Sequence, residues 1–113
     1  MTADWNSSPL PELYRGLAAN GLVRRLLELA HDEDVGDGDV TSEVCVPATA
    51  SAQARIVARS AGVVSGLAAL PDLLRVYRAS AALSLSASDG DAVPAGSTIA
   101  TLSGNKREIL TVE

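Results

Sequence analysis

Apolar residues recur at helical spacing over the first third of the chain. Ser8-Pro9 is a typical helix start and Asn20-Gly21 a typical stop, and four residues between them lie at positions i, i+3, i+4 and i+7: Leu10, Leu13, Tyr14 and Leu17. A second helix follows Gly21. Its predicted apolar face consists of five residues: Leu22, Val23, Leu26, Leu27 and Ala30. Both segments are therefore predicted to be amphipathic helices.

From Ser51 onward the period of the pattern changes to two, which is typical of strands with one buried face. Four segments are predicted to be strands: residues 53–59, 63–65, 81–87 and 97–102. Turn sequences bound the last of them, at Asp89-Gly90 and Pro94-Ala95-Gly96. Strands joined by tight turns are expected to pair in sequence order.

A third helix is predicted from Leu67 to Tyr77, provided that Pro71 lies in its first turn. A fourth begins at Lys106. Together with the strands, these helices predict an α+β domain: a small, mostly antiparallel sheet with helices packed on one face. We expect residues 1–20 to form an N-terminal arm with a short helix and residues 21–113 to form the domain.

The last predicted helix places three apolar residues, Ile109, Leu110 and Val112, just before the final residue, Glu113. Such a short helix covers little, so these residues are expected to form an exposed apolar face that favours association. This ending also predicts that the chain is a piece of a longer protein.

Composition narrows the possible functions. Hydrophobic residues make up 47% of the 113 residues but aromatic residues only 3%, so the core must be aliphatic. A formal net charge of −5 argues against binding to nucleic acids or anionic membranes. No segment approaches the ~20 apolar residues of a membrane span, and no signal sequence is evident, so the chain is predicted to be cytoplasmic. The single cysteine, Cys45, excludes an internal disulfide and is expected to be a small buried residue.

The densest charge lies from Asp32 to Asp39, where five carboxylates and two glycines fall within eight positions. A calcium loop beginning at Asp32 would place Gly36 fifth and Asp37 sixth, which inverts the order that such a loop needs. A carboxylate pair for acid–base chemistry is possible, but a solvated acidic loop is the stronger interpretation. His31 is expected to cap the end of the preceding helix, and Thr41 to cap backbone groups beside Asp39.

Other catalytic motifs are missing from the sequence. There is no GxxxxGK[ST], HExxH or GxSxG pattern. Arg55 and Arg59 share one face of a predicted strand, and we interpret them as a solvated face or an interface rather than as an anion site.

Three collinear segments resemble a known family. Glu33 to Thr41 is similar to E-D-x-G-x-G-D-x-T, and Ala58 to Leu67 is similar to A-R-x-x-G-V-[VL]-x-G-L. Asp89 to Gly104 and Arg107 to Glu113 then follow D-G-x-x-V-x-x-G-x-x-[IL]-A-x-[LV]-x-G and the approach to E-R-[TS]-x-L-N. From about Leu22 to its last residue, the chain thus resembles the N-terminal domain of quinolinate phosphoribosyltransferases (nicotinate-nucleotide pyrophosphorylases, carboxylating).

The resemblance implies an enzyme of NAD biosynthesis, a pentosyltransferase. It converts quinolinate and phosphoribosyl pyrophosphate to nicotinate mononucleotide, CO2 and pyrophosphate, with Mg2+ bound alongside the donor. In this family the catalytic α/β barrel follows the N-terminal domain, which contacts the barrel of the neighbouring subunit in a homodimer or higher homo-oligomer. The family's motif arginine would come directly after Glu113. The resemblance therefore assigns no catalytic, substrate-binding or metal-binding residue to this chain.

Electrostatics leads to the same expectation. Quinolinate is a dianion and the donor a polyphosphate, so binding both requires clustered arginine, lysine or a metal. The chain has one lysine, Lys106, and its densest charge is negative. We therefore predict that the 113-residue chain is inactive by itself and binds no cofactor.

Two alternatives remain open. The segment D-G-x-x-V-x-x-G-x-x-I-A also occurs in biotinyl and lipoyl carrier modules, but these need a lysine at a hairpin tip, and Lys106 comes too late in the sequence. A phosphoribosyltransferase-like protein linked to molybdate transport would share the same domain plan. The Glu33-Asp34 opening and the Leu110-Thr111-Val112-Glu113 ending favour the quinolinate enzyme.

Overall fold

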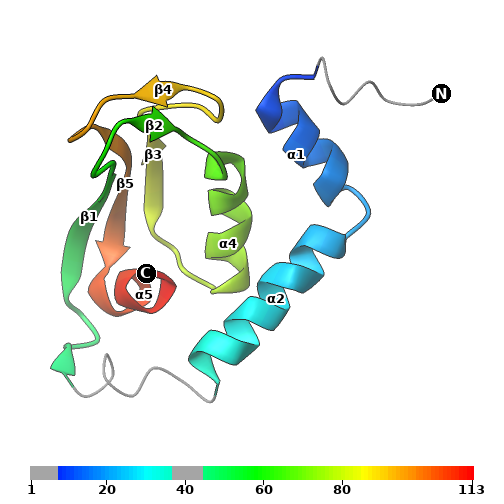
Figure 1. Ribbon diagram of the computed structural model, residues 1–113. Helices are drawn as coiled ribbons and strands as arrows, with labels where there is room; N and C mark the ends of the chain where they lie inside the picture. Colours follow the sequence, from blue (N-terminus) through cyan, green and yellow to red (C-terminus); the bar gives the residue numbers. More distant parts are fainter. Residues whose placement is uncertain (1–7, 37–44) are drawn as a thin grey trace.

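The computed structural model describes residues 8–36 and 45–113, which form an open α+β domain (Figure 1). The elements follow in the order α1 (Leu10–Ala18), α2 (Leu22–Val35), β1 (Ser51–Val57), β2 (Gly62–Val63), the 3-10 helix η1 (Leu67–Ala69), α4 (Leu70–Val76), β3 (Ala82–Leu85), β4 (Ala92–Val93), β5 (Thr98–Asn105) and α5 (Lys106–Val112). The predicted fold class, a small antiparallel sheet with helices, is confirmed. The predicted division at residue 20 stays a prediction.

The sheet pairs its strands in sequence order only in part. The strands predicted at 81–87 and 97–102 correspond to β3 and β5 and do pair, whereas the expected pairing of the earlier strands is wrong. The three-stranded sheet has the order β1-β5-β3, with both pairs antiparallel, and β2 pairs with β4 in a separate two-stranded ribbon. The last strand, β5, is therefore the central one. It is the longest strand and its sequence is rich in apolar and small residues, which suits a position between two neighbours.

The register places apolar residues of all three strands on one face of the sheet. Ile56 of β1 and Leu85 of β3 both lie opposite Ala100 of β5, and Ala54 and Leu83 both lie opposite Leu102. The other face carries residues such as Arg55 and Ser84 opposite Thr101. The period of two in the sequence thus correctly predicted one apolar and one polar face.

The core is small and aliphatic, as the composition predicted. Val64, Leu67 and the completely buried Ala100 form its centre. Five half-buried residues pack around them: Leu70, Leu83, Ala87, Val93 and Ile99. Figure 1 shows α4 between the sheet and the α1–α2 pair. Pro71 lies in the first turn of α4, where its missing N–H leaves no helical hydrogen bond unmade.

Helices α1 and α2 lie outside this core, and neither contains a buried residue. The predicted apolar face of α2 is divided: Val23 and Leu27 are half-buried, whereas Leu22 and Leu26 are exposed. Within the described ranges, no helix combines the length and the apolar character needed to cross a bilayer.

Helix α5 is held by polar contacts at its N-terminal end. The Asn105 side chain accepts a hydrogen bond from the amide of Glu108 (3.2 Å) and donates one to the carbonyl of Ala48 (2.7 Å). The Glu108 carboxylate accepts hydrogen bonds from the backbone N–H and the hydroxyl of Ser80, both at 3.0 Å. These links tie α5 to two distant segments of the chain.

The expected apolar face of α5 is only partly exposed. Ile109 is buried and Val112 half-buried, and Leu110 alone of the three is exposed. The difference arises because α5 packs against β1 and β5, so one side of this short helix is covered within the domain.

Candidate functional site

A groove of about 700 Å³ separates the helical pair from the body of the domain. Helix α1 and the start of α2 form one wall, with Pro11, Tyr14 and Arg15 among the lining residues. The other wall comes from η1, α4 and the connection between β3 and β4. The lining is largely apolar with a few charged groups, which is typical of small-molecule sites but also of an imperfectly filled contact between two layers.

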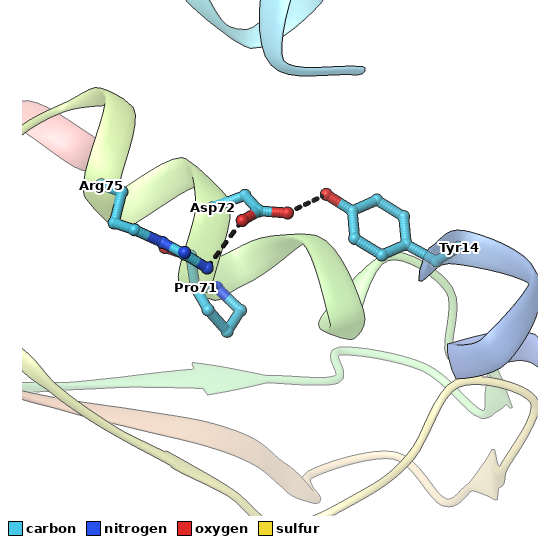
Figure 2. A network of polar contacts seen from close by, with 4 residues as sticks. All are labelled: Tyr14, Pro71, Asp72 and Arg75. Atoms are coloured by element: carbon cyan, nitrogen blue, oxygen red, sulfur yellow. Dashed lines mark hydrogen bonds and ion pairs between the residues drawn. The ribbon is translucent and has the colours of Figure 1, made fainter. Parts of the chain in front are cut away.

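A polar network crosses this groove (Figure 2). The hydroxyl of Tyr14 donates a hydrogen bond of 2.6 Å to the Oδ2 atom of Asp72, on α4. The other carboxylate oxygen of Asp72 accepts from the Arg75 guanidinium at 2.7 Å, and Arg75 Nε donates to the carbonyl of Pro71 at 3.3 Å. Asp72 lies in the first turn of α4, where the helix dipole favours a carboxylate. The network thus attaches α1 to α4.

The electrostatics of the groove keep the Tyr14 hydroxyl protonated. Burial raises the pKa of Tyr14 to about 12, and the hydrogen bond to Asp72 and the negative charge of that residue act in the same direction. The positive charge of Arg75 opposes them to a smaller extent. At neutral pH, Tyr14 is therefore a hydrogen-bond donor and not a general base.

The arginines that line the groove do not form an anion site. Arg75 is paired with Asp72, and Arg24 with Glu28 at 3.0 Å. Arg15, the third lining arginine, is exposed on α1. Because two of the three charges are already neutralised, the groove is better suited to holding α1 in place than to binding a polyphosphate.

A second link fixes the opposite wall of the groove. The carboxylate of Asp89 accepts hydrogen bonds from the amides of Leu67 (2.7 Å) and Ala68 (3.0 Å), which are the first two of η1. The residue before η1 is Gly66, which has no side chain that could cap the helix. Asp89 therefore supplies the cap from a distance of more than twenty residues along the chain. The sequence predicted a turn at Asp89-Gly90 but not this role.

The acidic segment predicted as a loop is partly helical, so that expectation is corrected. Helix α2 continues through Asp32, Glu33 and Asp34 to Val35 and ends at Gly36, whose φ is 56°. Gly36 donates its N–H to the carbonyl of Asp32 at 3.1 Å. The helix extends further than predicted because no residue before Gly36 interrupts it. Asp37, Gly38, Asp39 and Thr41 lie outside the described residues.

His31 does not cap a helix end, because α2 continues beyond it. Its ring packs edge-on against Tyr77 of the α4 C-terminus, with centroids 4.8 Å apart, and its Nδ1 lies 3.3 Å from the Asp32 carboxylate. The hydroxyl of Tyr77 donates to Asp34 at 3.3 Å. Burial and Asp34 together raise the pKa of Tyr77. These contacts connect α2 to α4.

The structure does not bring together the other residues considered from the sequence, namely Cys45, Arg55, Arg59 and Lys106. Cys45 is exposed, so its predicted burial is wrong. Arg55 and Arg59 are both exposed, as their interpretation as a solvated face requires. Lys106 is the first residue of α5 and not the tip of a hairpin. Within residues 8–36 and 45–113, no three His, Cys, Asp or Glu side chains lie close enough to hold a metal ion.

Comparisons with known proteins give a consistent result. The family model described as "Quinolinate phosphoribosyl transferase, N-terminal domain" matches residues 39–113. Over 92 residues the chain is 30% identical to quinolinate phosphoribosyltransferase [decarboxylating] 1 of Nicotiana glauca, and this region covers 80% of the chain and 26% of that protein. The chain therefore spans about a quarter of the length of this relative.

Solved structures show the same fold. The nicotinate-nucleotide pyrophosphorylase from Francisella tularensis superposes on 100% of this chain with a TM-score of 0.78 and 26% identity, over 37% of its own length. A second structure, from Streptococcus pyogenes, covers 79% of the chain with a TM-score of 0.73 and 24% identity. The second likeness supports the fold alone.

Proposed function

Since this chain belongs to the quinolinate phosphoribosyltransferase family through its N-terminal domain, we propose that it is the non-catalytic part of an enzyme of NAD biosynthesis. The reaction of that enzyme is the transfer of a phosphoribosyl group from phosphoribosyl pyrophosphate to quinolinate. Its products are nicotinate mononucleotide, CO2 and pyrophosphate. The match of residues 39–113 to the family model is the observation that carries this proposal.

The chemistry of the described residues favours a structural role for this domain over substrate binding. The arginines lining the groove are largely paired with carboxylates, and its tyrosine is held protonated. A dianionic acceptor and a polyphosphate donor need a cluster of unpaired cations, which these residues do not supply. We propose that the substrates are bound by the part of the enzyme that the relatives possess and this chain does not span, and that the chain alone is inactive.

We extend the proposal to the location, the assembly and the metal of this enzyme. The enzyme works in the cytoplasm as a homodimer or higher homo-oligomer, in which this domain contacts the barrel of a neighbouring subunit. It uses Mg2+, which neutralises charge on the pyrophosphate donor. Because the described residues of this chain form no group of metal ligands, they do not fit that ion, and we assign it to the substrate-binding part of the enzyme.

A domain exchange tests the proposal. Residues 1–113 would replace the matching N-terminal part of the Francisella tularensis enzyme, and nicotinate mononucleotide would be measured by chromatography after incubation with both substrates and Mg2+. The controls are the truncated enzyme without an N-terminal domain and this chain alone. We expect product from the chimera and none from the chain alone.

Two results would overturn the proposal. One is a chimera that is folded by circular dichroism and gel filtration and yet is no more active than the truncated enzyme. The other is quinolinate-dependent release of pyrophosphate by the chain alone, which would contradict the assignment of catalysis to the absent part.

A further inference from the structure

The turn between α1 and α2 contains the only asparagine of the chain that is followed by glycine, Asn20 before Gly21. Asn20 is exposed, and Gly21 has a φ of 80°, in the left-handed region that glycine adopts without strain. Asparagine is a thermolabile residue, and a following glycine makes it more so, because no side chain then hinders the approach of the next backbone nitrogen to the side-chain amide. The turn therefore combines a reactive residue with an accessible position.

The contacts of the Asn20 side chain favour attack on its amide carbon. The N–H of Leu22 donates a hydrogen bond of 3.1 Å to Asn20 Oδ1. Negative charge develops on this oxygen when a nucleophile adds to Cγ, and a backbone N–H that is already aimed at the oxygen stabilises that charge. The space beside Gly21 is open, since an added Cβ would meet nothing within 4 Å beyond its chain neighbours. Water can therefore reach the turn and a leaving group can depart from it.

A hydrogen bond of Gly21 opposes the reaction. Its N–H donates to the carbonyl of Ala18 at 3.1 Å, and this bond must break before the nitrogen can act as a nucleophile. The bond lies at the C-terminal end of α1, where the helix has no further turn to support it. Exposed helix ends open locally far more often than the core of a domain does. The opposing bond therefore slows the reaction without preventing it.

Asn105 provides an internal comparison within the described residues. It is half-buried, and its side-chain nitrogen donates to the carbonyl of Ala48 at 2.7 Å. The backbone nitrogen that would attack it belongs to Lys106 and donates to the carbonyl of Ala50 at 2.9 Å. Both the leaving group and the nucleophile are thus held at Asn105. At Asn20, the described residues provide no partner for the side-chain nitrogen.

We propose that Asn20 is a spontaneous deamidation site of the folded chain. The backbone nitrogen of Gly21 forms a bond to Asn20 Cγ, and the bond between Cγ and Nδ2 breaks. The proton of the attacking N–H leaves with Nδ2 as ammonia, which leaves a cyclic imide in the main chain. Water then opens the imide at either carbonyl, and no oxidant or reductant is needed.

The two products of ring opening differ in their effect on α1. Attack of water at Cγ gives aspartate, whose carboxylate lies beside the N-terminal end of α2, where the helix dipole favours it. Attack at the other carbonyl gives isoaspartate, in which the main chain runs through the side chain and is longer by one carbon. The Tyr14–Asp72 hydrogen bond of 2.6 Å attaches α1 to α4. A longer turn should displace α1 and weaken this bond.

Mass spectrometry of the 113-residue chain after incubation at mildly alkaline pH tests the proposal. Trypsin cleavage after Arg15 and Arg24 places Asn20 in a short peptide, and a sample without incubation gives the background. We expect the mass shift of deamidation at Asn20, in two products that chromatography separates, and none at Asn105 over the same period. The matched control is Asn20→Gln, which keeps the amide but whose longer side chain cannot close the same ring.

An Asn20 that stays intact in the folded chain would overturn the proposal. Conversion only after unfolding in urea would show that the turn protects the residue, and equal conversion of Asn20 and Asn105 would show that the turn confers no selectivity; both results count against the proposal. These measurements require no enzymatic activity, so they are independent of the domain-exchange experiment.

Hydrogen exchange tests the effect on α1. In the purified isoaspartate form, the amides of α1 should exchange about tenfold faster than in the unmodified chain, as expected for loss of a hydrogen bond to a charged group. Asn20→Asp carries the same charge on a normal main chain and should exchange like the wild type. Unchanged exchange in the isoaspartate form would refute the effect on α1.

Discussion

Tyr14→Phe should loosen the attachment of α1 to α4. The substitution removes the hydroxyl that donates to Asp72 at 2.6 Å and leaves the ring in place. A hydrogen bond to a charged group contributes roughly 1.5–3 kcal/mol, and Asp72 is part-exposed and keeps its second partner, Arg75. We therefore expect a loss near the lower end of that range, about 1–2 kcal/mol, in the free energy of unfolding measured by urea at neutral pH.

A double-mutant cycle with Asp72→Asn separates this bond from other effects of the substitutions. If the hydroxyl and the carboxylate interact as the geometry indicates, the double variant should lose about 1 kcal/mol less than the sum of the two single losses. Arg75→Met provides a control on the same carboxylate. The Arg75 side chain is 74% exposed, so loss of its ion pair should change stability by about 0.5 kcal/mol or less.

The contribution of Tyr14 to the free energy of unfolding should decrease at high pH. The pKa of Tyr14 is raised in the folded chain to about 12 from its ordinary value of 10, so the folded state retains the proton longer than the unfolded state. The stabilisation is therefore fully present below pH 10 and is lost as the pH rises through 12. The difference in stability between wild type and Tyr14→Phe should shrink across that interval. A coupling energy below about 0.3 kcal/mol, or a difference that grows above pH 10, would refute the reasoning.

Three further substitutions test other contacts. Asp89→Ala removes the cap of η1 and should lower the free energy of unfolding in urea by about 1–2 kcal/mol. The amides of Leu67 and Ala68, which donate to Asp89, should then exchange hydrogen faster, and unchanged exchange would contradict the cap. Gly104→Ala should lower the free energy of unfolding by about 2 kcal/mol or more, because φ is 157° and the new Cβ would lie 3.0 Å from the Cα of Ala81. Gly62→Ala is the control, since the space around Gly62 is open and thermal stability should change little. Glu108→Ala removes the acceptor for two hydrogen bonds from Ser80 and should lower the free energy of unfolding by about 1 kcal/mol. Glu108→Gln keeps one acceptor oxygen and should lower stability less in the same thermal scan.

Local patterns predicted the elements of this fold better than their arrangement. The periods of 3.6 and two placed most helices and strands approximately, and Pro71 lies in the first turn that its chemistry requires. The two-residue strand β4 was not predicted, and β5 continues three residues beyond its predicted end. Strand order was predicted wrongly because pairing of β1 with β5 joins residues about fifty positions apart, and nothing local encodes such a contact. The end of α2 was placed too early because acidic residues suggested a loop, whereas only Gly36 stops the helix.

The groove could not be found from the sequence for the same reason. Tyr14 and Asp72 are 58 positions apart, and each is an ordinary residue at an ordinary helical position. The family motifs gave no indication of them, because Tyr14 lies outside those segments and Asp72 between two of them. Asp89 does lie within a motif, but the pattern reveals only the turn and not its bond to η1. Sequence therefore predicted the family and the layers, while the polar links between the layers came only from the structure.

Polar contacts contribute more to the positions of α1 and α2 than is usual for surface helices. Hydrophobic burial normally supplies most of the stability of such a helix, yet no residue of α1 or α2 is buried. Partial burial of residues such as Val23 and Leu27 is supplemented by a tyrosine–carboxylate bond on α1 and by the contacts of Tyr77 with α2. Since net hydrogen-bond energies are modest, these links fix the direction of the pair more than they stabilise it. A partner that covered the exposed Leu22, Leu26 and Leu29 of α2 would stabilise the folded helices by mass action.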